Sequence, residues 1–171
     1  MKLEVLNLEI TARYHESLYV MKWVFEKLKK LKNVEIDFSC SGLEDGRAGE
    51  GCFVVALATN NPDLRVLHLE NYPSLSDETL DLLANSCPGL EEFRYSYRRF
   101  NVDITDRGIE RLVVAAKNLK HLHLDLGRAP RVTKDLVKRL REEYQDLITL
   151  KINRSRVLPV PNQIWAHLLH D

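Results

Sequence analysis

The sequence predicts an α/β solenoid of about six strand–helix units, with a parallel sheet on the concave side and helices on the convex side. The spacing Leu-x-x-Leu-x-Leu, with conservative replacements, recurs six times along the 171 residues, at intervals of 26 to 33 residues. Each recurrence is followed by apolar residues at helical spacing, and Asn61-Pro62 and Cys87-Pro88 end two of these stretches. Since one strand and one helix cannot bury their apolar faces alone, stacked copies would supply a shared core.

Each recurrence predicts a short strand, because its second and third apolar positions alternate with polar residues, as a half-buried strand requires. The six sets are Leu3/Leu6/Leu8, Leu31/Val34/Ile36, Leu64/Leu67/Leu69, Leu90/Phe93/Tyr95, Leu119/Leu122/Leu124 and Leu147/Leu150/Ile152. They divide the chain into units near residues 3–30, 31–63, 64–89, 90–118, 119–146 and 147–171. We therefore expect a single domain that spans residues 1–171.

The stretches between these strands carry apolar residues at i, i+3, i+4 and i+7, which form one face of a helix. The clearest sets are Leu80/Leu83/Ala84/Cys87 and Ile109/Leu112/Val113/Ala116, and looser ones are Leu18/Met21/Phe25/Leu28 and Leu136/Leu140/Tyr144. Ser76, Thr105 and Thr133 precede three of these stretches, where their side-chain oxygens can cap the first backbone N–H groups. Asp77 and Asp106 follow two of the caps, where the helix dipole favours a negative charge.

The charge and cysteine content exclude several classes of protein. The formal net charge is zero, so the composition indicates no general attraction to nucleic acid or membranes. Residues 1–90 carry nine Lys or Arg against fourteen Asp or Glu, whereas residues 91–171 carry sixteen against eleven. Cys40, Cys52 and Cys87 form neither a disulfide framework nor a CxxC pair, which fits a reducing compartment. No apolar stretch is typical of a signal peptide or a membrane span, so we expect an intracellular protein, cytoplasmic or nuclear, without a membrane partner.

Two segments, SLSDETLDLLANSCPGL (74–90) and DITDRGIERLVVAAKNL (103–119), resemble the cysteine-containing class of leucine-rich repeat. That class reads L-x-x-L-x-L-x-x-C-x-x-I-T-D-x-G-L-x-x-L-A-x-x-C-P-x-L and is characteristic of F-box/leucine-rich-repeat proteins, the substrate receptors of cullin-RING ubiquitin ligases. The matching positions are Ser76-Asp77 and Thr105-Asp106 for T-D, Gly108 for the glycine, Leu83-Ala84 for L-A and Cys87-Pro88 for C-P. The resemblance implies a leucine-rich-repeat fold and a non-catalytic protein-binding module that recognises substrates for ubiquitination.

The sequence also departs from this family pattern in ways that bear on function. The cysteine that usually follows each strand is replaced by Thr11, Ser39, Tyr72, Arg98, Gly127 and Ser155. The first strand is expected to begin near residue 3, which leaves no room before it for an F-box. We therefore expect a ligase adaptor to bind only through a segment outside this chain. The alternative is a stand-alone or engineered leucine-rich-repeat scaffold with no ligase role.

The concave face is the expected binding surface for a protein partner, because the third, fifth and seventh positions of each unit project from it. The residues that we select there are Glu35, Asp37, His68, Glu70, Arg94, Ser96, His121, His123, Asp125 and Lys151, and the other projecting positions are Val5, Asn7, Glu9, Asn33, Val66, Glu92, Thr149 and Asn153. Acidic side chains give way to basic ones along the stack, which could fix the register of an oppositely charged partner. Tyr72, Tyr97 and Arg98 are expected at the edge of this face, where they would contact the partner. Alternatively, Tyr72 covers the edge of the core.

Other kinds of chemistry have little support in the sequence. His121, His123 and Asp125 are side chains that bind zinc, but at i, i+2 and i+4 of a strand they lie parallel, roughly 6–7 Å apart. We therefore expect no metal and no cofactor. No histidine accompanies Cys40 or Cys52 in the sequence, so we expect no enzyme. Metal binding and nucleic-acid binding are the remote alternatives, and the equal numbers of acidic and basic residues argue against a nucleic-acid partner.

Overall fold

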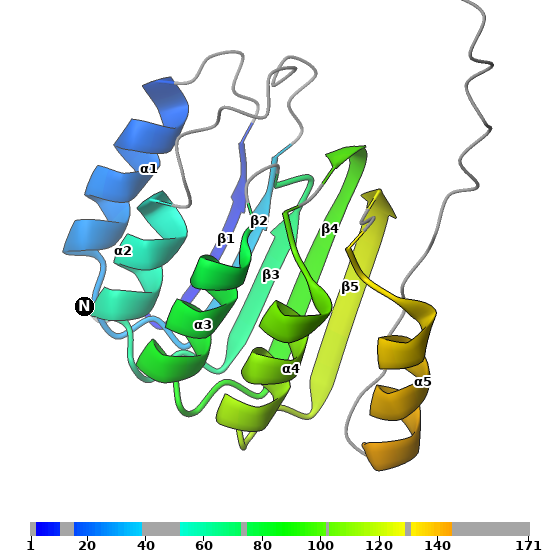
Figure 1. Cartoon of the computed structure of the whole chain (residues 1–171). Helices are drawn as coiled ribbons and strands as arrows, with labels where there is room; N and C mark the ends of the chain where they lie inside the picture. The colour runs from blue at the N-terminus through cyan, green and yellow to red at the C-terminus, as the bar shows by residue number, and fades with distance from the viewer. Residues whose placement is uncertain are drawn as a thin grey trace, which may run out of the picture.

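The structure is a computed structural model of the chain and describes residues 3–10, 16–38, 52–72, 75–101, 103–128 and 131–144. Strands and helices alternate along these residues (Figure 1). In chain order they are β1 (Val5–Glu9), α1 (Glu16–Lys27), β2 (Asn33–Asp37), α2 (Cys52–Asn60), β3 (Val66–Glu70), α3 (Asp77–Ser86), β4 (Glu92–Asn101), α4 (Asp106–Ala115), β5 (His121–Arg128) and α5 (Lys134–Glu143). The expected sixth unit, which includes Lys151, lies outside the described residues.

The strands form one parallel sheet in the order β1-β2-β3-β4-β5, so that strands adjacent in the chain are also neighbours in the sheet. The five helices lie together on one face of this sheet (Figure 1). A doubly wound α/β sheet, by contrast, reverses its strand order and carries helices on both faces. The predicted α/β class, with a parallel sheet and a separate layer of helices, is confirmed for these five units.

The core lies between the sheet and the helices, where the repeated apolar positions of the sequence meet. The pairing register aligns Leu6, Val34, Leu67, Phe93 and Leu122 in one row and Leu8, Ile36, Leu69, Tyr95 and Leu124 in the next. The members of both rows on β2 to β5 are at most 1% exposed, whereas Leu6 and Leu8 on β1 are half-buried. Burial of each such side chain contributes roughly 1.5–3 kcal/mol, so these rows hold neighbouring units together.

In three motifs the first leucine is placed by the turn that ends the preceding helix. The backbone N–H groups of Leu64, Leu90 and Leu119 donate to the carbonyl oxygens of Asn61, Cys87 and Ala116 at 3.1, 3.0 and 2.9 Å. Leu31, Leu64 and Leu90 are fully buried and Leu119 is 5% exposed. The same turn therefore places Leu64, Leu90 and Leu119 in a common apolar spine behind the sheet, which also contains Leu31.

Hydrogen bonds at the start of each strand set the pairing register. The carbonyl oxygens of Glu4, Lys32, Arg65 and Glu91 each accept two bonds, at 2.7–3.1 Å, from consecutive N–H groups of the following unit. The side chains at the same positions form ion pairs between units, with Lys32 Nζ 3.0 Å from Glu4 Oε2 and Lys120 Nζ 2.8 Å from Glu91 Oε2. Each unit is thus aligned with its predecessor before its strand begins.

Asn61 joins two units through the only buried amide side chain among the described residues. Its Oδ1 accepts from the backbone N–H of Leu31 at 2.8 Å, and its Nδ2 donates to the carbonyl oxygens of Leu57 at 2.8 Å and Leu28 at 3.1 Å. A buried backbone group without a partner costs about 1–3 kcal/mol. The asparagine side chain therefore supplies hydrogen-bond partners to backbone groups near the ends of α1 and α2.

The predicted helix N-caps are confirmed. The side chains of Ser76, Thr105 and Thr133 accept from the backbone N–H groups of Thr79, Gly108 and Leu136 at 3.4, 3.4 and 3.2 Å. Each cap thus satisfies one N–H group in the first turn of its helix.

Asp77 and Asp106 do more than complement the helix dipole. The two Asp77 oxygens accept from the backbone N–H and the Oγ1 hydroxyl of Thr105 at 2.8 and 2.6 Å. Asp106 holds Thr133 in the same way at 2.7 and 2.5 Å. Each aspartate therefore clamps the start of its own helix to the start of the next one.

Gly108 leaves the space that the first of these clamps occupies. A Cβ atom at this position would lie 2.0 Å from Asp77 Oδ1 and 3.0 Å from Asp77 Cβ. Two bonds to Thr105 hold the carboxylate in place, so it cannot move aside without losing them. The glycine is required by the approach of a neighbouring side chain rather than by its own backbone angles.

Gly108→Ala should therefore destabilise the fold by about 1–2 kcal/mol, because the loss of charge-assisted bonds from Asp77 exceeds the roughly 1 kcal/mol that alanine gains in a helix. In an Asp77→Ala background the clash is gone, and the same change should be neutral or stabilising. Urea unfolding of the four proteins in this cycle measures both effects. If Gly108→Ala lowered the free energy of unfolding by the same amount in both backgrounds, the contact between Gly108 and Asp77 would be contradicted.

Candidate functional site on the open sheet face

The candidate site is the sheet face opposite the helices, which we call the open face. It is formed by three rows of side chains at alternate strand positions. The register gives Val5, Asn33, Val66, Glu92 and His121 in the first row, Asn7, Glu35, His68, Arg94 and His123 in the second, and Glu9, Asp37, Glu70, Ser96 and Asp125 in the third. The predicted alignment of these positions is confirmed for the five described strands.

A chain of charged side chains crosses the middle of the open face. His68 Nδ1 lies 3.0 Å from Glu35 Oε1 on β2, and His68 Nε2 lies 3.0 Å from Glu92 Oε1 on β4. Arg94 Nε donates to the same Glu92 oxygen at 2.6 Å. The side chain of His68 is only 15% exposed. The network fixes the orientation of four polar side chains from three adjacent strands before a ligand binds.

The electrostatic environment of Glu92 reflects this network. Its partial burial raises the pKa of the carboxyl group, but hydrogen bonds from His68 and Arg94, together with their positive charges, outweigh that effect. The pKa of Glu92 consequently lies below its ordinary value. Glu92 is therefore ionised at neutral pH and is the shared acceptor of His68 and Arg94.

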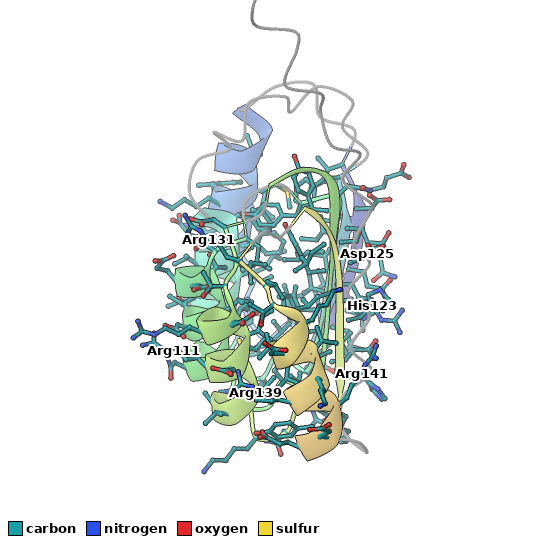
Figure 2. All side chains as sticks on the ribbon, turned by 45° about the vertical axis from the view of Figure 1, so that its right-hand side comes forward. Arg111, His123, Asp125, Arg131, Arg139 and Arg141 are labelled. Carbon is teal, nitrogen blue, oxygen red and sulfur yellow. The ribbon has the colours of Figure 1, made fainter. Side chains whose placement is uncertain are left out.

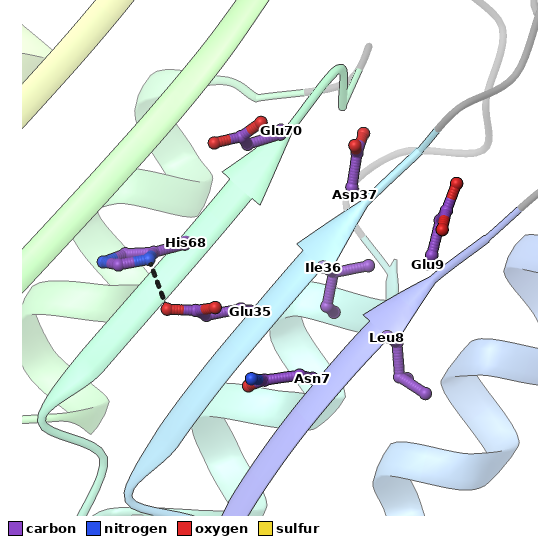
Figure 3. A pocket seen from close by; sticks show the side chains of 8 residues that line it. All are labelled: Asn7, Leu8, Glu9, Glu35, Ile36, Asp37, His68 and Glu70. Carbon is purple, nitrogen blue, oxygen red and sulfur yellow. Dashed lines mark ion pairs between the residues drawn. The ribbon is translucent and has the colours of Figure 1, made fainter.

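A shallow hollow of about 460 Å³ lies beside this network, over β1 to β3. Its lining, drawn in Figure 3, is Asn7, Leu8, Glu9, Glu35, Ile36, Asp37, His68 and Glu70. Glu9, Asp37 and Glu70 are direct neighbours in the third row, on strands about 4.8 Å apart. Three adjacent carboxylates give this part of the open face a negative potential.

One residue beyond β3 helps to hold the acidic row in place. Asn71 has a φ of 57°, a left-handed conformation that asparagine tolerates better than most residues. Its Nδ2 donates to Asp37 Oδ1 at 2.8 Å, and its backbone N–H donates to Ser96 Oγ at 3.4 Å. Asn71 thus links the ends of β2, β3 and β4 at the margin of the hollow.

The other end of the open face is less acidic. Arg94 and His121 are exposed, and His123 is half-buried on β5. Figure 2 shows His123 on the sheet side of the molecule, opposite Arg111 in the layer of helices. The change from carboxylates over β1 to β3 toward Arg94 and the histidines follows the direction expected from the sequence.

The structure corrects the assignment of three selected residues. Tyr72 is 1% exposed and Tyr97 is 3% exposed, so neither presents its ring to a partner. The Tyr72 ring instead packs against the rings of Phe38 and Phe53, at centroid distances of 5.3 and 4.9 Å, which is the alternative role considered for it. Asp125 is 4% exposed and is also withdrawn from the contact surface. The side chains of Arg98 and Lys151 lie outside the described part of the structure.

Sequence reasoning did not select three residues that the structure brings into the site. Asn7 and Glu9 line the hollow, and Glu92 is the shared acceptor of the charged network. All three occupy projecting positions in the motif. The signal that identifies Glu92 is its position in the register, where it pairs with Val66 two residues before His68 pairs with Arg94 and therefore projects from the same face.

The structure also shows how the candidate metal ligands and Cys87 are placed. Within the ranges given above, no three His, Cys, Asp or Glu side chains lie close enough to hold a metal ion. Cys87 is fully buried, and its burial raises the pKa of the thiol to about 12. Cys40 and the side chain of Cys52 lie outside the described structure. Among the described residues, no helix has both the length and the apolar character that a bilayer span requires.

The described residues define an α/β protein with one layer of helices on a parallel sheet whose opposite face carries charged side chains. A comparison of the sequence with models of protein families finds no match, and a comparison with curated proteins finds none either. The function must therefore be inferred from the geometry of the open face and from the residues that build it.

The Cys87 thiol should resist alkylation in the folded protein. At pH 8 its thiolate fraction is reduced roughly a thousandfold relative to an ordinary cysteine, and the side chain is inaccessible. Peptide-resolved mass spectrometry after iodoacetamide treatment should show labelling of Cys87 in urea but not in native buffer. Equal labelling rates in both conditions would contradict its burial.

Glu92→Gln should flatten the acid limb of the stability profile. The pKa of Glu92 is depressed in the folded protein. Its ionised form therefore stabilises the fold when the pH is above the ordinary pKa of a glutamate, and this contribution is lost as the pH falls through the pKa of the folded protein. Urea unfolding between about pH 6 and pH 3 should show a larger loss for the unmodified protein than for the variant. Parallel profiles for the two proteins would argue against the network.

Proposed function

We propose that this protein is a leucine-rich-repeat solenoid and a non-catalytic protein-binding module, whose open face is the concave binding surface. The sequential parallel sheet, the single layer of helices and the aligned leucines all support a stacked-repeat fold. The residues that carry the family resemblance also occupy contacts between units. Asp77 holds Thr105, Gly108 makes room for Asp77, and the Cys87 thiol lies 3.7 Å from the carbonyl oxygen of Ala58 in the preceding unit.

The observation that carries the binding function is the charged network of Glu35, His68, Glu92 and Arg94 on a sheet face that no described helix covers. The five strands extend the face over about 19 Å, at about 4.8 Å per strand. A surface of this breadth suits another protein or an extended peptide better than a small molecule, which usually binds in an enclosed pocket. Side chains that are already oriented lose less conformational entropy when a partner binds.

The charges of the open face indicate the character of the partner. The hollow over β1 to β3 presents Glu9, Glu35, Asp37 and Glu70, so it favours a segment rich in lysine or arginine. The surface near Arg94, His121 and His123 favours carboxylates. A partner whose basic and acidic groups are arranged in the opposite order would bind in one orientation.

The family resemblance supports a more specific role as the substrate-recognition domain of an F-box ubiquitin-ligase receptor. The ligase adaptor would then bind a segment outside this chain. A stand-alone or engineered repeat scaffold with no ligase role would use the same open face, and the two cases differ in whether ligase adaptor subunits are captured together with the protein.

Charge reversal on the open face should abolish partner binding without loss of fold. Glu35→Lys combined with Glu70→Lys reverses two carboxylates that line the hollow. Glu26→Lys combined with Glu142→Lys makes the same change in net charge on α1 and α5, where these side chains are 44% and 61% exposed. The unmodified chain and the helix-face control should capture the same proteins. The open-face variant should capture at least tenfold less of each.

Quantitative mass spectrometry of the captured proteins measures this loss, and circular dichroism checks that all three proteins are folded. Equal capture by the open-face variant would remove the open face as the binding surface. Equal loss with the helix-face control would show that net charge, rather than the site, controls capture.

A further inference from the structure

The exposed apolar side chains of the described residues gather at one end of the sheet. Four of the six large exposed ones belong to the first unit: Leu3 at 40%, Val5 at 54%, Val20 at 59% and Trp23 at 62%. Leu6 and Leu8 on β1 are also only half-buried, although their counterparts on β2 to β5 are at most 1% exposed. A concentration of this kind marks an interaction surface rather than an ordinary protein surface.

The outer edge of β1 presents the backbone groups of Val5 and Asn7 on the same side. The Glu4 carbonyl accepts from β2 residues, and the Ile10 N–H donates to the Asp37 carbonyl at 2.8 Å. Because alternate residues of a strand direct their backbone groups to opposite sides, those of Val5 and Asn7 point away from β2. No other described strand pairs with this side of β1. An edge of this kind is a template for a further strand.

We propose that the edge is covered by β1 of a second copy of this chain, in an antiparallel pair centred on Asn7. In this register Asn7 lies opposite the Asn7 of the other copy, and their outward N–H and carbonyl groups can bond to each other. Leu6 lies opposite Leu8, so the half-buried leucines complete their burial. Glu9 lies opposite Val5, so that no carboxylates oppose each other, whereas a register centred on Glu9 would place the two Glu9 side chains together.

The helices fit the same two-fold arrangement. Residues directly opposite in an antiparallel pair project from the same face, so the two open faces merge and the two helix layers lie on the other side. This arrangement brings α1 next to its copy. Val20 and Trp23 are exposed near the middle of α1, and tryptophan is one of the residue types enriched at the energetic centres of protein interfaces.

The proposed dimer would also extend the binding surface, although it does not depend on the proposed function. Asn7, Leu8 and Glu9 of β1 line the hollow, so the hollow borders the edge that the second copy would cover. Two hollows would then flank one seam on a continuous sheet. A partner with two basic segments could engage both hollows, which raises the effective affinity without any new type of contact.

Sedimentation velocity on the full chain tests the dimer. We expect a concentration-dependent dimer for the unmodified protein and at least a tenfold weaker association for Trp23→Glu. Val114→Glu is the matched control, because Val114 is 66% exposed on α4, away from the proposed interface, and it should associate like the unmodified protein. Circular dichroism monitors the fold of each variant.

Disulfide formation tests the register. With Cys40 and Cys52 replaced by serine, Asn7→Cys should give a disulfide-linked dimer, because opposed Cα atoms in such a pair lie about 5.5 Å apart. Val5→Cys should not, because its copy would lie roughly 14 Å away along the strands.

Three results would overturn the proposal. A protein that stays monomeric at about 100 μM, well above the range of stable dimers, would mean that another segment or no partner covers β1. Oligomers larger than a dimer would indicate end-to-end stacking instead of a two-fold axis. Equal crosslinking of Asn7→Cys and Val5→Cys would exclude the register.

Discussion

The paired hydrogen bonds at the start of each strand are the interaction on which the rest of the structure depends. One carbonyl oxygen in each unit accepts two consecutive N–H groups of the next, from Glu4 to His121. A slip of one residue would turn every core leucine toward solvent and every open-face side chain toward the helices. The Asp77 and Asp106 clamps secure the same alignment at the starts of the helices. Core, sheet and site therefore share one register.

Charged side chains are arranged differently on the helix layer and on the open face. In the layer of helices, acidic and basic side chains of successive units pair, as in Asp81 with Arg111 at 2.5 Å and Glu110 with Arg139. Figure 2 labels both arginines on this layer. On the open face, Glu9, Asp37 and Glu70 are direct neighbours, an arrangement that opposes folding. These neighbouring like charges give this end of the open face its negative potential.

The first unit shows how position in the stack changes the role of the same motif. Leu67 and Leu69 are fully buried because strands flank them on both sides. Leu6 and Leu8 occupy the equivalent positions, yet they stay half-buried at the end of the sheet. The pattern is identical in sequence, and the difference arises from the missing neighbour among the described strands. This contrast is the physical basis of the dimer proposed above.

The sequence by itself determined the strand–helix alternation of the five described units, the spine of leucines, the three N-caps and the strand positions that face away from the helices. These features follow from local periodicity and from short side-chain-to-backbone bonds, which a linear pattern reveals. Only the tertiary structure decided that Tyr72 and Tyr97 are buried, that Asp77 clamps Thr105, and that Glu92 joins His68 to Arg94. These contacts join residues from different units, and their formation depends on how the units stack rather than on spacing within one unit.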